Sequence, residues 1–162
     1  MAKTQIDAPA GVPFIDMSRE FDAPRDLVFK AYTDPELLVQ WLGPRKYKMT
    51  VESWDVRDGG RWRYVNSDDD GNAWGFHGVF HGDQTPDGML QTFEFEGSPG
   101  NVSLESLVFE DEDGKTIIRN HSVYQSVQAR DAMIESGMEG GVNEGFDRLD
   151  ELISKLREPA AR

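Results

Sequence analysis

Apolar and polar residues alternate from about Tyr47 to Tyr124, and this alternation constrains the fold more than any other feature of the chain. A period of two residues is typical of β-strands that bury one face. Short clusters of Gly, Asp, Asn and Pro interrupt the pattern and divide it into six predicted strands. Strands joined by such short turns pair as an antiparallel meander. The segment from Val12 to Phe21 predicts one further strand before it.

Helical signals lie on both sides of this meander. Asp22 and Pro24 are typical of a helix start, and a second short helix begins at Pro35 and ends before Gly43. After the meander, apolar residues recur at spacings of three and four over about residues 129–157, which predicts one long amphipathic helix. So many aromatic residues cannot stay exposed on a sheet. We therefore expect an α+β fold in which a curved sheet packs around the long helix.

The length of the chain fits a single domain. A domain typically holds about 100–200 residues, and this chain has 162. Residues 1–11 are small or polar and predict a flexible N-terminal tail, residues 12–157 are the expected domain, and residues 158–162 are the expected C-terminal tail. No apolar stretch resembles a signal peptide or a membrane span, so we expect no membrane insertion. Cysteine is absent, which fits a reducing compartment, and we expect a cytoplasmic location.

Acidic residues dominate the second part of the chain. The sequence has 17 Lys and Arg against 30 Asp and Glu, a net charge of −13. Residues 1–63 are electrically balanced, so the excess lies in residues 64–162. A polyanion repels phosphates, and we expect no nucleic acid partner. An acidic surface is compatible with a protein partner of basic character, and we expect a monomer or a homodimer.

Histidine and acidic residues give weak candidates for chemistry. His77 and His81 are four residues apart, but on a strand their α-carbons would lie about 13 Å apart, too far to share a zinc ion. We expect no metal and no cofactor. His77, Glu94 and His121 lie on predicted strands, where they are acid or base candidates only if they face a cavity. The alternative is that they point to solvent or bind one another.

Glycine residues on the predicted final helix are the most informative local feature. Gly137, Gly141 and Gly145 recur at every fourth position and therefore share one side of a helix. Each costs about 1 kcal/mol relative to Ala in a helix interior. Either the glycines let the helix approach the sheet closely, or the missing side chains leave room for a ligand. Met133 and Met138 nearby are suited to an adaptable pocket wall.

The aromatic sheet and the glycine side of the helix together predict a cavity for a small hydrophobic ligand. Successive strand residues point to opposite faces, so the sequence leaves open which aromatic side chains point inward. The candidate lining residues are Trp54, Trp62, Tyr64, Trp74, Phe76, Phe80, Phe93, Phe95, Met133, Met138, Gly141, Val142, Gly145 and Phe146.

Several short segments resemble one known family. They are Trp41-Leu42-Gly43-Pro44, Asp55-x-Arg57-x-Gly59-Gly60-x-Trp62, Gly75-Phe76-His77-Gly78, Ser136-Gly137-Met138-Glu139 and Leu149-Asp150-Glu151-Leu152. Over about residues 12–157, the chain resembles stand-alone bacterial members of the activator of Hsp90 ATPase homologue family, within the START/Bet v 1-like (SRPBCC) superfamily. The resemblance implies a helix-grip fold. In that fold a seven-stranded antiparallel sheet surrounds a long C-terminal helix, and two short helices after the first strand close one end.

The same resemblance implies an apolar cavity that binds lipids, polyketides or other hydrophobic molecules. From the aromatic sheet and the glycine side of the helix, we expect binding without catalysis. Some relatives are cyclases, aromatases or transfer proteins, so a cavity enzyme of cyclase, dehydratase or hydrolase type is an alternative. The eukaryotic namesake stimulates a chaperone ATPase with the help of an additional N-terminal domain. A chaperone-associated or stress-response interaction protein is therefore a further alternative. Function resides in sites rather than in folds, so the family alone does not decide among these.

Overall fold

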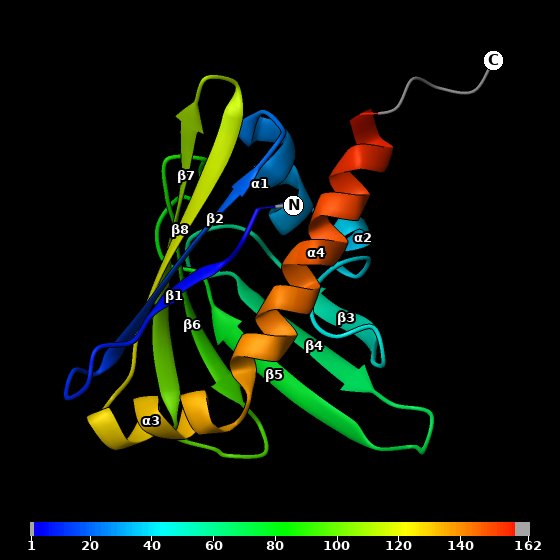
Figure 1. Cartoon of the computed structure of the whole chain (residues 1–162). Helices are drawn as coiled ribbons and strands as arrows, with labels where there is room; N and C mark the ends of the chain where they lie inside the picture. The colour runs from blue at the N-terminus through cyan, green and yellow to red at the C-terminus, as the bar shows by residue number, and fades with distance from the viewer. Residues whose placement is uncertain (1, 158–162) are drawn as a thin grey trace.

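The structure is a computed structural model that describes residues 2–157. Eight antiparallel strands form one curved sheet with the spatial order β1-β2-β8-β7-β6-β5-β4-β3 (Figure 1). The strands are β1 (Gln5–Asp7), β2 (Phe14–Phe21), β3 (Lys48–Trp54), β4 (Arg61–Ser67), β5 (Ala73–Val79), β6 (Met89–Phe95), β7 (Val102–Glu112) and β8 (Lys115–Val123).

Four helices accompany the sheet. They are α1 (Arg25–Thr33), α2 (Pro35–Leu38), α3 (Val127–Glu135) and α4 (Met138–Arg157). Figure 1 shows α4 running diagonally across the sheet, α3 crossing one end of it, and α1 near the opposite end. The predicted α+β fold, with a curved antiparallel sheet around a long C-terminal helix, is confirmed.

The predicted number of seven strands is wrong, because β1 adds an eighth. It pairs with β2, and Gln5 lies opposite Ser18. β1 falls inside residues 1–11, which the sequence predicts to be a flexible tail. Three residues with one apolar side chain, Ile6, are too few for alternation to reveal a strand. The predicted C-terminal tail, residues 158–162, lies outside the described residues.

The predicted single long helix over residues 129–157 is also wrong, because a break at Gly137 divides it into α3 and α4. Gly137 has a φ of +83°, a left-handed conformation that glycine adopts without steric cost. Its backbone N–H donates to the carbonyl of Ile134 at 3.2 Å and closes the end of α3. The chain then changes direction, so α3 and α4 cover different parts of the sheet (Figure 1).

Gly145 allows α4 to lie directly against the loop that follows α2. A β-carbon at this position would be 3.3 Å from the backbone nitrogen of Gly43 and 3.4 Å from the carbonyl oxygen of Trp41. Gly141 faces Pro44 at an ordinary contact distance of 3.7 Å. Gly145 therefore makes the close approach that is one of the two alternatives, but to this loop rather than to a strand.

Charged side chains hold α4 in the same position. The Arg19 side chain points from β2 toward α4, is almost fully buried, and lies 2.9 Å from Asp147 and 2.5 Å from Asp150. Arg148 of α4 donates a hydrogen bond of 2.7 Å to the Gly43 carbonyl. Charge-assisted bonds of this kind are short and directional, so they fix both the position and the rotation of the helix.

The hydrophobic core fills the part of the concave face nearest α1. Trp41 is buried there, and its indole N–H donates to the Ala31 carbonyl at 3.0 Å. The other fully buried large side chains of the core include Phe21, Val28, Leu38, Phe109, Ile118 and Leu149.

The two helical glycines Gly140 and Gly145 give a matched test of the close approach. Gly140 has open space where a β-carbon would be, so we expect Gly140→Ala to raise the free energy of unfolding by about 0.5 kcal/mol. Gly145→Ala should give no gain, or a loss, because its β-carbon meets backbone atoms. Urea unfolding of both variants measures the difference. An equal gain from both would contradict this account of Gly145.

Candidate ligand-binding cavity

Strand alternation divides the side chains of the sheet between a concave inner face and a convex outer face. On β5, Trp74 and Phe76 point into the concave side, whereas the residue after Phe76, His77, contacts Glu96 on the convex side. The same alternation on β4 places Tyr64 inward and Arg63 outward. The inner face is therefore largely aromatic and the outer face is charged.

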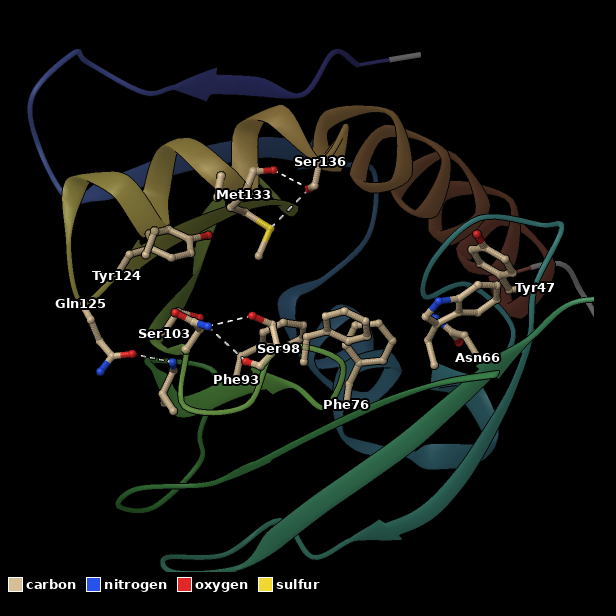
Figure 2. Close-up of a pocket in the computed structure, with 16 residues that line it drawn as sticks. Tyr47, Asn66, Phe76, Phe93, Ser98, Ser103, Tyr124, Gln125, Met133 and Ser136 are labelled. Atoms are coloured by element: carbon tan, nitrogen blue, oxygen red, sulfur yellow. Dashed lines mark hydrogen bonds between the residues drawn. The ribbon is translucent and has the colours of Figure 1, made fainter. Parts of the chain in front are cut away.

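An outer chamber lies between α3 and the nearby ends of the strands, with a volume of about 480 Å³. Figure 2 shows Met133 extending from α3 toward the sheet, where Phe93 and Phe76 lie. At the far side, the ring of Tyr47 packs 5.2 Å from that of Trp74. The remaining lining residues are Asn66, Phe95, Ser98, Asn101, Val102, Ser103, Tyr124, Gln125, Ala129, Ala132 and Ser136.

An inner chamber of about 310 Å³ lies deeper, between the concave face and α4. Its walls include Trp62 and Tyr64 from β4 and Phe146 from α4. Both chambers adjoin, because they share the lining residues Asn66, Phe93, Tyr124 and Met133. Their volumes are in the range of about 300–1,000 Å³ that is usual for small-molecule sites.

All of the predicted lining residues except Phe80 border one or both chambers. Trp74, Phe76 and Phe95 line the outer chamber, and Phe93 and Met133 line both. The inner chamber is bordered by Trp54, Trp62, Tyr64, Met138, Gly141, Val142, Gly145 and Phe146. Phe80 is fully buried in the core instead, with its ring 5.5 Å from that of Trp54. That these residues contact a ligand stays a prediction.

The acid–base candidates His77, Glu94 and His121 do not line either chamber. His77 is 42% exposed, and its ring lies 2.9 Å from Glu96 and 3.4 Å from Glu94. His121 is 45% exposed and lies 2.6 Å from Asp16. Their positions on the strands give all three the parity of the outer face, so they point away from the cavity.

Glu105 of β7 is the acidic residue that lines the cavity, and the sequence analysis did not identify it. It borders the inner chamber, and burial raises its pKa to about 7. No hydrogen bond or ion pair to its carboxylate is found among the described side chains, so burial is the cause of this shift. A carboxyl group in this condition titrates near neutral pH.

The polar groups around Glu105 are neutral. Gln91 of β6 and Ser122 of β8 are its direct neighbours on the two adjacent strands. Tyr32, Tyr64 and Tyr124 line the same chamber. The pKa values of their phenols are raised chiefly by burial and further by the charge of Glu105. The pKa of Tyr124 rises to about 12, so its hydroxyl keeps its proton at neutral pH.

The composition of β7 explains why Glu105 was missed. Leu104 and Val108 are apolar but lie on the outer face, 41% and 38% exposed. Leu107 and Phe109 are buried, and Glu105 has their parity along the strand. Counting back from Phe109 along β7 in steps of two residues leads through Leu107 to Glu105, which therefore points inward.

Two further features concern residues 2–157 as a whole. In this part of the chain, no group of three or more His, Asp or Glu side chains is arranged to hold a metal ion. None of its helices is long and apolar enough to cross a membrane.

Comparison with known proteins identifies relatives over most of the chain. The family model described as "Activator of Hsp90 ATPase homolog 1-like protein" matches residues 22–154. A crystal structure of a Rhodobacter sphaeroides protein is 25% identical with a TM-score of 0.87, and covers 94% of this chain and 99% of its own. No match was found among curated proteins.

Two other solved structures have the same fold. The solution structure of an Arthrobacter aurescens protein is 25% identical with a TM-score of 0.85, and covers 96% of this chain and 92% of its own. The crystal structure of protein Ms6760 from Mycobacterium smegmatis is 23% identical with a TM-score of 0.82, and covers 97% of this chain and 100% of its own.

The raised pKa of Glu105 makes stability depend on pH. Between its ordinary pKa of 4.5 and its folded pKa of about 7, the folded protein holds a proton that the unfolded chain has released. Stability therefore falls as pH rises through this window and levels off above it. Glu105→Gln removes the charge, so it should be more stable than the wild type by up to about 3 kcal/mol at pH 8 and similar at pH 4.

Urea unfolding of both proteins at pH 4, 6 and 8 measures this difference. Comparison with the variant isolates Glu105 from other groups that titrate in the same range. A difference that stays constant across these pH values would show that Glu105 is not buried in its charged state.

Proposed function

Because this chain belongs to the activator of Hsp90 ATPase homologue 1-like family, we propose that it binds a small hydrophobic molecule, of lipid or polyketide type, in its two adjoining chambers. The family supports a role in ligand binding or interaction. The observation that carries the finer proposal is the pair of adjoining, mainly apolar chambers between the concave face, α3 and α4. Protein interiors are normally packed to the density of organic crystals. A hollow of this size in so small a protein indicates a place for an occupant.

The walls of the cavity are preorganised by aromatic packing. Trp62 and Tyr64 are stacked with ring centroids 5.4 Å apart, Tyr64 and Phe76 with centroids 5.2 Å apart, and Phe76 lies 5.6 Å from Phe93. These rings form a ladder across β4, β5 and β6 that continues from the inner to the outer chamber. A ligand that enters the cavity buries its apolar surface away from water, and the wall does not have to reorganise to receive it. Both effects favour affinity.

A cavity enzyme is the second candidate, and one observation favours it. Glu105 lies in the inner chamber with a pKa near 7, which suits a group that accepts or donates a proton at neutral pH. Binding without turnover remains the leading proposal, because the acid–base candidates on the other strands lie outside the cavity. A Glu105→Gln variant that binds a substrate but no longer converts it would support the enzyme.

The chaperone-associated alternative rests on the family and on the acidic surface, and no described contact singles it out. The cytoplasmic location and the monomeric or dimeric state stay predictions. Size-exclusion chromatography with light scattering tests the oligomeric state.

Filling the inner chamber should weaken ligand binding while leaving the fold intact. Val142 borders this chamber from α4, so we expect Val142→Phe to weaken the binding of a neutral hydrophobic dye such as Nile red at least tenfold, because the ring occupies the space of the ligand. Fluorescence titration measures the affinity.

The matched control is Val108→Phe, the same substitution on the outer face of β7, where the side chain is exposed. It should leave the affinity of the dye within about twofold of the wild type. Equal loss of binding in both variants, or in neither, would contradict the proposal that the dye enters the cavity.

A further inference from the structure

The lining of the cavity contains one acidic side chain and no basic one. Of the residues lining the two chambers, Glu105 alone is acidic, and there is no Lys, Arg or His. The remaining polar groups are neutral amides and hydroxyls, such as Asn66, Gln91 and Ser122. A ligand in the inner chamber therefore meets a site with a net charge of minus one or zero, set by the protonation of Glu105.

The carboxylate form of Glu105 has no partner among residues 2–157. Glu105 is partly buried, its carboxylate oxygens stay accessible from the chamber, and no hydrogen bond or ion pair among the described residues involves them. Burying an ionised carboxylate without a partner is costly, and the cost is relieved by an opposite charge close by. The cavity supplies no such charge, so the ligand is the remaining source of one.

The aromatic walls favour the same charge. Trp62 and Tyr64, stacked with ring centroids 5.4 Å apart, and Phe93 border the inner chamber. The faces of aromatic rings carry partial negative charge and attract organic cations. The carboxyl group of Glu105 therefore favours positive ligands over negative ones, and the aromatic lining is compatible with that preference.

We propose that the inner chamber selects lipophilic organic cations, with a protonated amine or quaternary ammonium group seated at Glu105 and an apolar body extending toward the outer chamber. This inference rests on the proposed function, because it names the class of hydrophobic ligand that the same cavity takes. It also excludes anionic lipids such as fatty acids as preferred ligands, since their carboxylate would lie beside Glu105.

The test uses three probes that share one apolar body and differ in charge. They are 2-(1-naphthyl)ethylamine, which is a cation at pH 8, the neutral alcohol 2-(1-naphthyl)ethanol, and 1-naphthaleneacetate, the anion of 1-naphthaleneacetic acid. Isothermal titration calorimetry at pH 8 should give at least tenfold tighter binding of the amine than of the alcohol, and the weakest binding of the carboxylate. Equal affinities for amine and alcohol would overturn the inference while leaving the proposed function in place. Absence of binding by all three would count against both.

Glu105→Gln should remove the preference for the amine and leave the affinity for the alcohol within about threefold. Unchanged alcohol binding shows that the variant is folded and that its cavity is intact. Glu94→Gln is the matched control, because Glu94 lies outside both chambers, beside His77. It should keep the preference of the wild type. A preference that survives in Glu105→Gln, or is lost equally in Glu94→Gln, would overturn the assignment to Glu105.

The preference should also depend on pH in a defined direction. Glu105 is ionised above its pKa of about 7 and neutral well below it, and the phenols of Tyr32, Tyr64 and Tyr124 that line the same chamber stay protonated throughout. The ratio of amine to alcohol affinity should therefore fall toward one between pH 8 and pH 5. A ratio that does not change over this range would contradict the role of Glu105.

Discussion

The cavity depends on the way α4 is fixed against only one part of the concave face. Gly145 brings α4 into contact with the backbone of the loop at Gly43, and Arg19 joins its buried side to β2 through Asp147 and Asp150. These contacts lie near the hydrophobic core at the α1 end. The break at Gly137 then turns the preceding segment aside as α3, so no helix fills the space beneath it. Close packing at one end and a hollow at the other follow from the same anchoring.

The chemistry of the hollow follows from strand parity. Each strand that adds an aromatic ring to the inner face must place its polar neighbours outside, which is why His77 and Glu96 pair on the convex surface. β7 departs from this rule, since Glu105 points inward and Leu104 outward. Exceptions to a local pattern are most often found where a protein uses the residue. This exception puts a single titratable group into a space otherwise built from apolar and neutral polar side chains.

Much of the fold could be predicted from the sequence, because alternation and helical spacing are direct records of burial. The six strands of the meander and the amphipathic α4 were of this kind. β1 was too short to show a pattern, and the break at Gly137 was hidden because apolar spacing continues across it. For the site, the aromatic walls were predicted as a set, but Glu105 was not, because hydropathy on β7 contradicts its register. Register is fixed by tertiary packing, which no single strand records.

The central claim is that this protein carries a hydrophobic small molecule in its cavity, and native mass spectrometry tests it most directly. The protein should be purified without detergent from the cells in which it occurs, alongside the Val142→Phe variant expressed in the same cells. The account predicts that the wild type carries a bound small molecule of defined mass and that the variant does not. A wild-type protein with no added mass, or a bound mass that is equally present in Val142→Phe, would contradict the account.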